Sequence, residues 1–264
     1  MYDVKKIVLF LFSGTGMTKY IIDKMKPEFE KQQAQFDVFS IESVQLQNIS
    51  LGHYDAIGVA YPVHSFNAPK IVIDFTRRLP KTESQDAFII SSAGELSPLN
   101  NASSDLLIKI FTKKGYNVFY DIQFEMPCNF LIKDDEGKVL DKLSRANADI
   151  PSVVSKILDS VKGLRHSSFG VKILAFFGRA EWYGVKYFKL LYTNKKCNNC
   201  GICVSSCPNR NIEHGATKAV FKRNCGLCMR CIYLCPNQAI KAYWLYKSIS
   251  FDSWYDFDEL SILD

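Results

Sequence analysis

The chain has 264 residues, of which 47% are hydrophobic and 13% aromatic, and its formal net charge is +6. This length suits one large domain or two smaller ones, and the hydrophobic content excludes a disordered chain. The longest apolar candidate, residues 173–192, is interrupted by charged residues and falls short of the roughly 18 uninterrupted apolar residues of a membrane span. With no recognisable export signal, we expect a soluble, cytoplasmic protein without a membrane span.

The first 160 residues alternate short apolar segments with longer amphipathic ones. Strands are expected over Val4–Phe12, Phe36–Ile41, Tyr54–Tyr61, Asp86–Ala93 and Asn117–Phe124. Helices are expected over Thr18–Lys31, Pro69–Leu79, Ala102–Lys114 and Ile150–Val161, with Pro27 kinking or ending the first and residues 134–138 forming an exposed turn. Repeated β–α units of this size predict a doubly wound parallel sheet, whose ligands bind at the carboxyl ends of the strands.

A turn rich in glycine and hydroxyl side chains joins the first strand to the first helix: Ser13, Gly14, Thr15, Gly16, Met17 and Thr18. Its glycines allow a tight turn that exposes backbone N–H groups, and the helix N-terminus adds a partial positive charge. The turn has no lysine, unlike the loop of nucleotide triphosphatases, and it lacks the dinucleotide-binding spacing. It therefore favours a single terminal phosphate, although the same residues also occur in an ordinary helix cap.

This turn resembles the flavodoxin phosphate loop, Ser/Thr-x-Thr-Gly-Asn-Thr, which binds the phosphate of FMN, with Met17 in the place of the usual Asn. The resemblance extends over roughly residues 4–160 and implies a flavodoxin-like fold with FMN as cofactor. It also implies two loops around the isoalloxazine ring, after the third and fourth strands. Their candidate contacts are Tyr61, Pro62, Val63, His64, Phe66 and Asn67 in the first ring loop, and Ser92, Ala93, Gly94 and Glu95 in the second.

Several of these candidates have an alternative role. His64 can bind a flavin carbonyl and tune the flavin's potential, or it can simply be solvated. Tyr61 and Phe66 can stack on the ring or belong to the core. Gly94 suits a close backbone approach to the ring edge, and Glu95 is either a proton donor to reduced flavin or a solvated carboxylate.

Eight of the nine cysteines form two runs with identical spacing: Cys197-x2-Cys200-x2-Cys203-x3-Cys207-Pro208 and Cys225-x2-Cys228-x2-Cys231-x3-Cys235-Pro236. This is the bacterial iron–sulfur pattern, in which the fourth cysteine of each run binds the other run's cluster. The pattern implies two 4Fe–4S clusters. The first has the ligands Cys197, Cys200, Cys203 and Cys235, and the second has Cys225, Cys228, Cys231 and Cys207.

Other uses of these thiols are disfavoured. Structural zinc usually takes two separated Cys-x2-Cys pairs, whereas here three cysteines follow in succession, twice. A disulfide framework needs an oxidising compartment. Cys128 lies outside both runs, and we expect it to be a structural or incidental thiol.

The charge is unevenly distributed along the chain. Residues 195–247 hold nine Lys or Arg against Glu213, a net +8, and residues 248–264 hold five acids and no base, a net −5. Two clusters of about −2 each would reduce the +8 to about +4. The sequence therefore predicts no nucleic-acid partner, while an acidic redox partner remains compatible. It also raises the hypothesis that the acidic tail folds back over the basic cysteine-rich region.

The combination of motifs resembles the clostridial-type fused flavodoxin–ferredoxin family. We expect a flavodoxin-like FMN-binding domain over 1–165, an aromatic linker over 166–192, a small α+β two-cluster ferredoxin domain over 193–242 and an acidic aromatic tail over 243–264. The resemblance implies an anaerobe's electron-transfer protein that relays electrons between the clusters, FMN and a redox partner. An FMN-dependent reductase of a small substrate, fed by the clusters, is the alternative, with His64 and Glu95 as candidate acids. The donor, acceptor and oligomeric state are not predicted.

Overall fold

The computed structural model describes residues 4–128, 134–187 and 191–242. These residues form two compact units. The first holds the described residues of Met1–Ser13, Met17–Pro127 and Glu136–Gly178, and the second those of Gly14–Gly16, Cys128–Asp135 and Arg179–Asp264. No helix in the described part of the chain is both long and apolar enough to cross a membrane.

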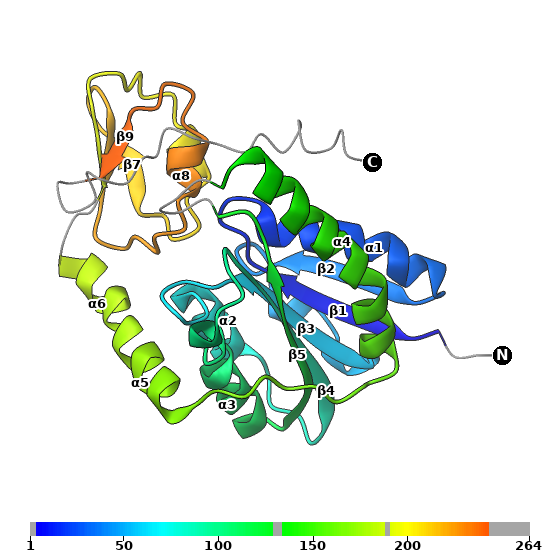
Figure 1. Ribbon diagram of the computed structural model, residues 1–264. Helices are drawn as coiled ribbons and strands as arrows, with labels where there is room; N and C mark the ends of the chain where they lie inside the picture. The colour runs from blue at the N-terminus through cyan, green and yellow to red at the C-terminus, as the bar shows by residue number, and fades with distance from the viewer. Residues whose placement is uncertain (1–3, 129–133, 188–190, 243–264) are drawn as a thin grey trace. The chain divides into compact units, whose positions relative to one another are not determined.

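The first unit is built on a five-stranded parallel sheet in the order β2-β1-β3-β4-β5 (Figure 1). Its strands are β1 (Lys6–Leu11), β2 (Gln35–Ser40), β3 (Ala56–Pro62), β4 (Gln85–Ala93) and β5 (Tyr116–Glu125). This is the order of the flavodoxin-like doubly wound fold, which places its ligand at the switch point between β1 and β3. The five predicted strands and the predicted fold class are confirmed.

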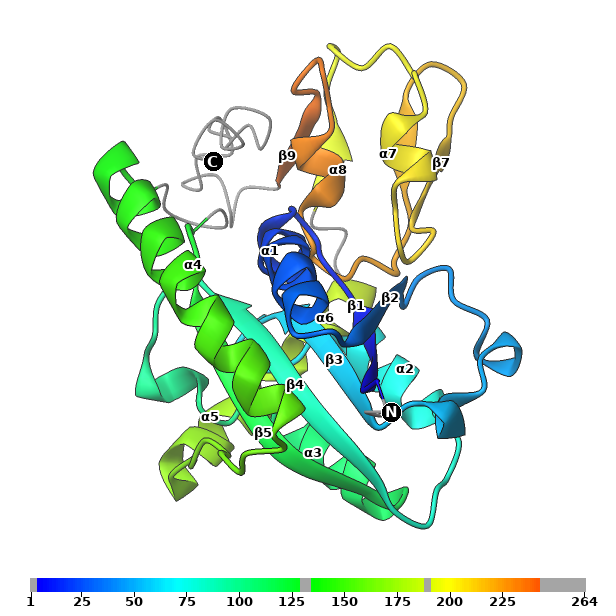
Figure 2. The same ribbon diagram turned by 90° about the vertical axis from the view of Figure 1, so that its right-hand side faces the viewer.

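Helices cover both faces of the sheet. Figures 1 and 2 show α1 and α4 together on one face, and α2 and α3 on the other. Their bounds are α1 (Met17–Lys31), α2 (Lys70–Arg78), α3 (Asp105–Lys113) and α4 (Glu136–Leu158), and three single-turn 3-10 segments, η1 (Leu46–Asn48), η2 (Leu51–His53) and η3 (Pro98–Asn100), lie in the connections. Gly115 ends the turn after α3 with a φ of +90°, and a Cβ there would lie 1.8 Å from the Thr82 carbonyl oxygen. The turn therefore requires glycine.

Two details of the helices differ from the sequence-based expectation. Pro27 does not end α1, which continues to Lys31. Since Asp23 and Pro27 are both exposed, water can satisfy the Asp23 carbonyl that the proline cannot bind. The predicted exposed turn over 134–138 is wrong in its second half, because α4 begins at Glu136, whose carboxylate suits a first helical turn.

The core of the first unit lies between the central strands and the helices. Residues 7–10 of β1 and 56–61 of β3 are buried without interruption, as expected for parallel strands covered on both faces. The rings of Phe10 and Phe75 lie 4.8 Å apart, which joins β1 to α2. On the other face, Phe29 of α1 stacks on Phe36 of β2 at 4.1 Å.

An ion pair secures the open edge of the sheet. The backbone of Gly163 exchanges two hydrogen bonds with β5, at Phe119 and Asp121, and so covers an edge that would otherwise be unpaired. Arg165 then binds the Asp121 carboxylate through two nitrogens, at 2.9 and 3.1 Å. The Asp121 side chain is 0% exposed and that of Arg165 16%.

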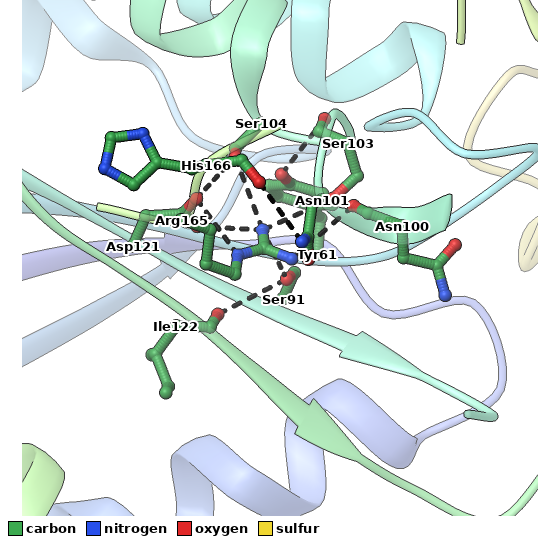
Figure 3. A network of polar contacts seen from close by, with 10 residues as sticks. All are labelled: Tyr61, Ser91, Asn100, Asn101, Ser103, Ser104, Asp121, Ile122, Arg165 and His166. Atoms are coloured by element: carbon green, nitrogen blue, oxygen red, sulfur yellow. Dashed lines mark hydrogen bonds and ion pairs between the residues drawn. The ribbon is translucent and has the colours of Figure 1, made fainter. Parts of the chain in front are cut away.

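The same guanidinium joins three further segments, as Figure 3 shows. Arg165 donates to the hydroxyl of Ser91 on β4, to those of Ser103 and Ser104 before α3, and to the carbonyl of Asn100. A charge this deeply buried is tolerated only when it is paired and hydrogen-bonded. The segment after α4 is thereby fastened to the carboxyl half of the sheet.

The second unit is small and contains both helices and strands. β6 (Leu191–Thr193) pairs with β9 (Ile240–Ala242), and β7 (Ile212–His214) with β8 (Ala219–Phe221), both antiparallel. The described helices include α6 (Ala180–Tyr187), α7 (Ile202–Ser205) and α8 (Arg230–Tyr233), whereas α5 (Phe169–Gly178) belongs to the first unit. The apolar core of this unit contains Leu191, Ile212, Phe221, Leu227, Ile232 and Ile240, together with Cys203 and Cys231.

We predict that Asp121→Ala lowers the free energy of unfolding by about 3–5 kcal/mol, because it leaves the Arg165 charge buried without a partner. Urea unfolding of the full chain measures this. Replacing both partners (Asp121→Ala with Arg165→Met) should recover part of the loss. Asp74→Ala, which breaks an exposed ion pair with Arg77, should cost less than about 1 kcal/mol. Equal losses in the two single variants would contradict the prediction.

Candidate functional site

The carboxyl edge of the sheet brings the three predicted FMN loops together. Ser92, at the end of β4, lies at their meeting point. Its hydroxyl is 2.8 Å from that of Thr18 in the phosphate loop, and its carbonyl accepts a hydrogen bond of 2.8 Å from the backbone N–H of Val63 in the first ring loop. The segments 13–18, 61–67 and 91–95 are therefore neighbours, at the place where a doubly wound sheet binds its ligand.

The phosphate loop has the local geometry of an anion cradle. It runs over residues 13–16 before the 15-residue helix α1, and Gly16 has a φ of 103°, which glycine alone adopts without strain. The Ser13 hydroxyl accepts a hydrogen bond from the backbone N–H of Lys19 in the first helical turn. Met17 and Thr18 are buried, so any contribution of Met17 to a ligand is limited to its backbone. The donor set fits one phosphate group.

The first ring loop is held in a tight reversed turn. The backbones of His64 and Asn67 exchange two hydrogen bonds of 2.8 Å, while Ser65 and Phe66 between them have φ values of 44° and 63°. Positive φ is costly for residues other than glycine, so the surroundings must impose it. The Asn67 amide does so by donating to the carbonyls of Ser65 and of Ala175 in α5, each at 2.8 Å. Helix α5 thus fixes this loop, a contact that the sequence did not indicate.

Two residues of this loop have altered proton affinity. Tyr61 is fully buried and donates from its hydroxyl to the Ser103 carbonyl; burial, followed by the negative charge of Asp121, raises the pKa of Tyr61 well above its ordinary value. The Tyr61 side chain is therefore part of the core beneath the first ring loop. Desolvation by burial lowers the pKa of His64 to about 4, so its imidazole is neutral at physiological pH. Phe66 and Pro62 are half-buried.

The second ring loop has three successive carbonyls held by three different elements. The Ser92 carbonyl accepts from Val63, as described above. The Ala93 carbonyl accepts from the backbone N–H of Met126, at 2.8 Å, and the Gly94 carbonyl accepts from the ammonium of Lys142 on α4, at 2.7 Å. Glu95 is exposed, which agrees with the interpretation of a solvated carboxylate.

In the second unit the eight cysteines of the two runs separate into two groups. Burial raises the pKa of the Cys203 thiol to about 11, and Cys197, Cys235 and Cys200 add to the rise. The pKa of the Cys231 thiol is likewise raised by burial, then by Cys228, Cys225 and Cys207, with a smaller effect of Cys203. Each group thus combines three cysteines of one run with the fourth of the other, and the buried members of the two groups lie close enough to influence one another.

The two runs have duplicate backbone geometry. Positive φ values occur at equivalent positions of each: Asn199 and Leu227, Gly201 and Met229, Arg210 and Gln238. The fourth cysteines are also equivalent, since Cys207 Sγ accepts from the N–H of Asn211 and Cys235 Sγ from that of Ala239, each at 3.2 Å. Left-handed residues turn the chain back repeatedly, which allows thiols three residues apart to point at a common centre. N–H···S bonds of this kind also tune cluster potentials.

The donor chemistry fits iron–sulfur clusters. Cys197, Cys200, Cys203 and Cys235 line one cavity, together with apolar side chains such as Ile202 and Ile240. Raised pKa values mean that such thiolates need positive charge beside them, which iron provides. No group of three or more His, Cys, Asp or Glu in the described residues is arranged to hold a metal ion. The four ligands of a 4Fe–4S cluster bind four different irons and so surround a larger object than one ion.

Cys128 lies apart from both cysteine groups. Its backbone N–H donates to the Asp134 carboxylate, at 2.9 Å, and its thiol does not contribute to the pKa shift of either Cys203 or Cys231. It serves below as a matched control for the eight predicted ligands.

Comparison with known proteins adds two findings. A family model described as a 4Fe-4S dicluster domain matches residues 189–236, which contain both cysteine runs. Among solved structures, the chain is similar to a flavodoxin from the domain Archaea (17% identity, 58% of this chain and 99% of that one, TM-score 0.33). It is also similar to a Megasphaera elsdenii flavodoxin (15%, 54% and 98%, 0.38) and to an azoreductase from Bacillus anthracis (6%, 58% and 100%, 0.41). No curated protein matches.

At these identities and scores the strand order, rather than the structural likeness, identifies the fold. The chain thus combines a flavodoxin-like domain with a region similar to a 4Fe–4S dicluster domain in one polypeptide. The match over residues 189–236 indicates an iron–sulfur region of the kind that carries electrons.

We predict that stability falls with acid because of His64. Its pKa is about 4 in the folded chain and about 6.5 when unfolded, so the unfolded chain binds the proton first as pH falls. The stabilisation is complete above pH 6.5 and is lost between 6.5 and 4, by at most about 3 kcal/mol. Unfolding free energies at pH 7 and 4.5 should therefore differ less in His64→Gln than in the wild type. Equal pH dependence in both would contradict the assignment.

Proposed function

We propose that the protein is an electron carrier. Two 4Fe–4S clusters exchange electrons with an FMN bound at the carboxyl edge of the sheet, and the electrons pass on to a redox partner. The arrangement of the eight thiols carries the proposal. They form two groups, each with three cysteines of one run and the fourth cysteine of the other run. This exchange of the fourth ligand is typical of two-cluster ferredoxins. The first cluster takes Cys197, Cys200, Cys203 and Cys235, and the second Cys225, Cys228, Cys231 and Cys207.

The residues around the thiols suit this role. Apolar side chains such as Ile232 and Ile240 exclude water from the core that the thiols share. Solvent exclusion and N–H···S bonds both tune the reduction potential of a cluster. Because Cys203 contributes to the raised pKa of Cys231, the two predicted cages are close to each other, which favours passage of single electrons between them.

The flavin half of the proposal rests on the three converging loops. In this proposal residues 13–18 hold the phosphate, while the turn at 64–67 and residues 92–95 border the isoalloxazine ring. Bound FMN would supply a carrier that holds one or two electrons. Linking the two cofactor domains in one chain replaces a diffusional encounter by a high effective concentration.

A carrier is favoured over a reductase by the state of His64. General acids work best when their pKa lies near the operating pH, and His64, with a pKa of about 4, is a neutral imidazole at pH 7 and therefore a poor general acid. The other candidate acid in the ring loops, Glu95, is exposed. A reduced-flavin turnover assay with small acceptors tests the point, because sustained turnover in the absence of a protein partner would favour the reductase.

Anaerobic reconstitution of the full chain should yield about eight irons, about eight sulfides and one FMN. Iron, sulfide and flavin analyses measure these contents. About four irons would reject the two-cluster version, and zinc in place of iron would reject the cluster assignment altogether.

Cys235→Ser should lose the first cluster, although Cys235 belongs to the second run. We expect the iron content to fall to about four, and the electron paramagnetic resonance signal that remains should be the one that Cys228→Ser abolishes. Cys128→Ser is the matched control and should retain about eight irons. If Cys235→Ser and Cys228→Ser abolished the same signal, each run would bind its own cluster and the exchanged ligand sets would be wrong.

Gly16→Val should weaken FMN binding at least tenfold while leaving the iron content unchanged. The φ of 103° at Gly16 is inaccessible to valine without strain, so the phosphate loop must change shape. Fluorescence titration of the flavin measures the affinity, and iron analysis of the same sample is the control. Unchanged affinity would remove the phosphate loop from the proposal.

A further inference from the structure

Lys142 is the only buried lysine in the described part of the chain, with 8% of its surface exposed. It lies on the inner face of α4, between the apolar positions Val139 and Ala146. Burying an ammonium group costs several kcal/mol unless it is paired and hydrogen-bonded. Such a residue at the carboxyl edge of a ligand-binding sheet is a candidate for a functional role.

The contacts of Lys142 point toward the second ring loop. Its ammonium donates to the Gly94 carbonyl, at 2.7 Å. Glu125 Oε1 lies 3.8 Å from the Lys142 ammonium, and the other oxygen of Glu125 is 3.3 Å from Arg145. Glu125 is thus shared between two cations.

The hydrogen bond to Gly94 sets the direction of a peptide group. In a trans peptide the C=O and the following N–H point in opposite directions. By drawing the Gly94 carbonyl toward α4, Lys142 directs the N–H of Glu95 to the opposite side. The preceding carbonyls of Ser92 and Ala93 are held by Val63 and Met126, so Lys142 completes the fixation of the loop that follows β4.

We propose that Lys142 is a positioning residue of the flavin site, which orients the Gly94–Glu95 peptide toward the polar edge of the ring and favours the reduced flavin through its positive charge. The inference rests on the proposed function. Reduction adds negative charge to the ring system, and a cation in a site of low dielectric stabilises that charge more than it would in water. A hydrogen bond and a charge near the ring are the means by which a protein tunes a flavin.

Lys142→Met in the full chain removes the charge and the donor at similar side-chain length. Reduced FMN should then bind about tenfold more weakly relative to oxidised FMN, which lowers the two-electron midpoint potential by about 30 mV. Anaerobic titration with a reference dye measures the potential, and FMN extraction and thermal unfolding establish that the variant is loaded and folded. Lys142→Arg should keep the potential near that of the wild type.

Glu125→Gln gives a test of opposite sign. It removes the carboxylate that lies 3.8 Å from the Lys142 ammonium and should raise the midpoint potential, whereas a merely structural role of this pair predicts no systematic shift. If Lys142→Met does not fold, Glu125→Gln still tests the role of Lys142. The matched control is Lys156→Met, on the exposed side of α4 and about 21 Å further along the helix at 1.5 Å per residue. Its potential should be unchanged.

The outcomes separate this inference from the proposed function. If the wild type binds FMN but Lys142→Met, folded and loaded, has the same potential, the role of Lys142 is wrong and the carrier function stands. A fall of the potential in Glu125→Gln would overturn the inference in the same way. If the wild type binds no FMN at all, the flavin half of the proposed function fails, and the role of Lys142 fails with it.

Discussion

Six of the eight run cysteines lie in or against the small core of the second unit, and the need to accommodate them shapes this unit. Buried thiols that face one another resist ionisation, as the raised pKa values of Cys203 and Cys231 show, so the group needs positive charge to act as a set of thiolate ligands. Residues with positive φ at equivalent positions of the two runs turn the chain so that the thiols face one another. Met229 is one of them, although glycine would adopt this conformation with less strain. The duplicate geometry follows from the duplicate spacing of the cysteines.

In the first unit, the backbone groups at the carboxyl ends of the strands also need partners. The carboxyl ends of parallel strands leave carbonyls and loops at one edge, and each loop there needs a partner to hold its shape. Ser92 joins the loops after β1, β3 and β4. Asn67 ties the reversed turn after β3 to α5, and Lys142 ties the loop after β4 to α4. A binding site assembled from rigid, mutually supported loops is suited to a cofactor whose electronic properties depend on nearby dipoles and charges.

These two arrangements complement each other chemically. In the proposed function, the thiols of the second unit hold groups that carry single electrons, and the loops of the first unit hold the phosphate and the ring of FMN. His64, in the first ring loop, is neutral at physiological pH, and Lys142 places a positive charge at the second ring loop.

The sequence by itself determined the features that depend on local spacing. Alternation of apolar and helical segments gave the five strands within two residues of their observed ends, and the cysteine spacing indicated both groups of thiols, because residues three apart can reach one centre. Tertiary structure decided the rest. The sequence could have drawn attention to Lys142, a lysine in an apolar helical stripe, but not to its partner Gly94. Arg165 with Asp121, and Asn67 with Ala175, join residues far apart in the chain. Pairings of this kind, and the desolvation that lowers the pKa of His64, arise only when the chain is folded, since no local pattern specifies which distant groups exclude water from one another.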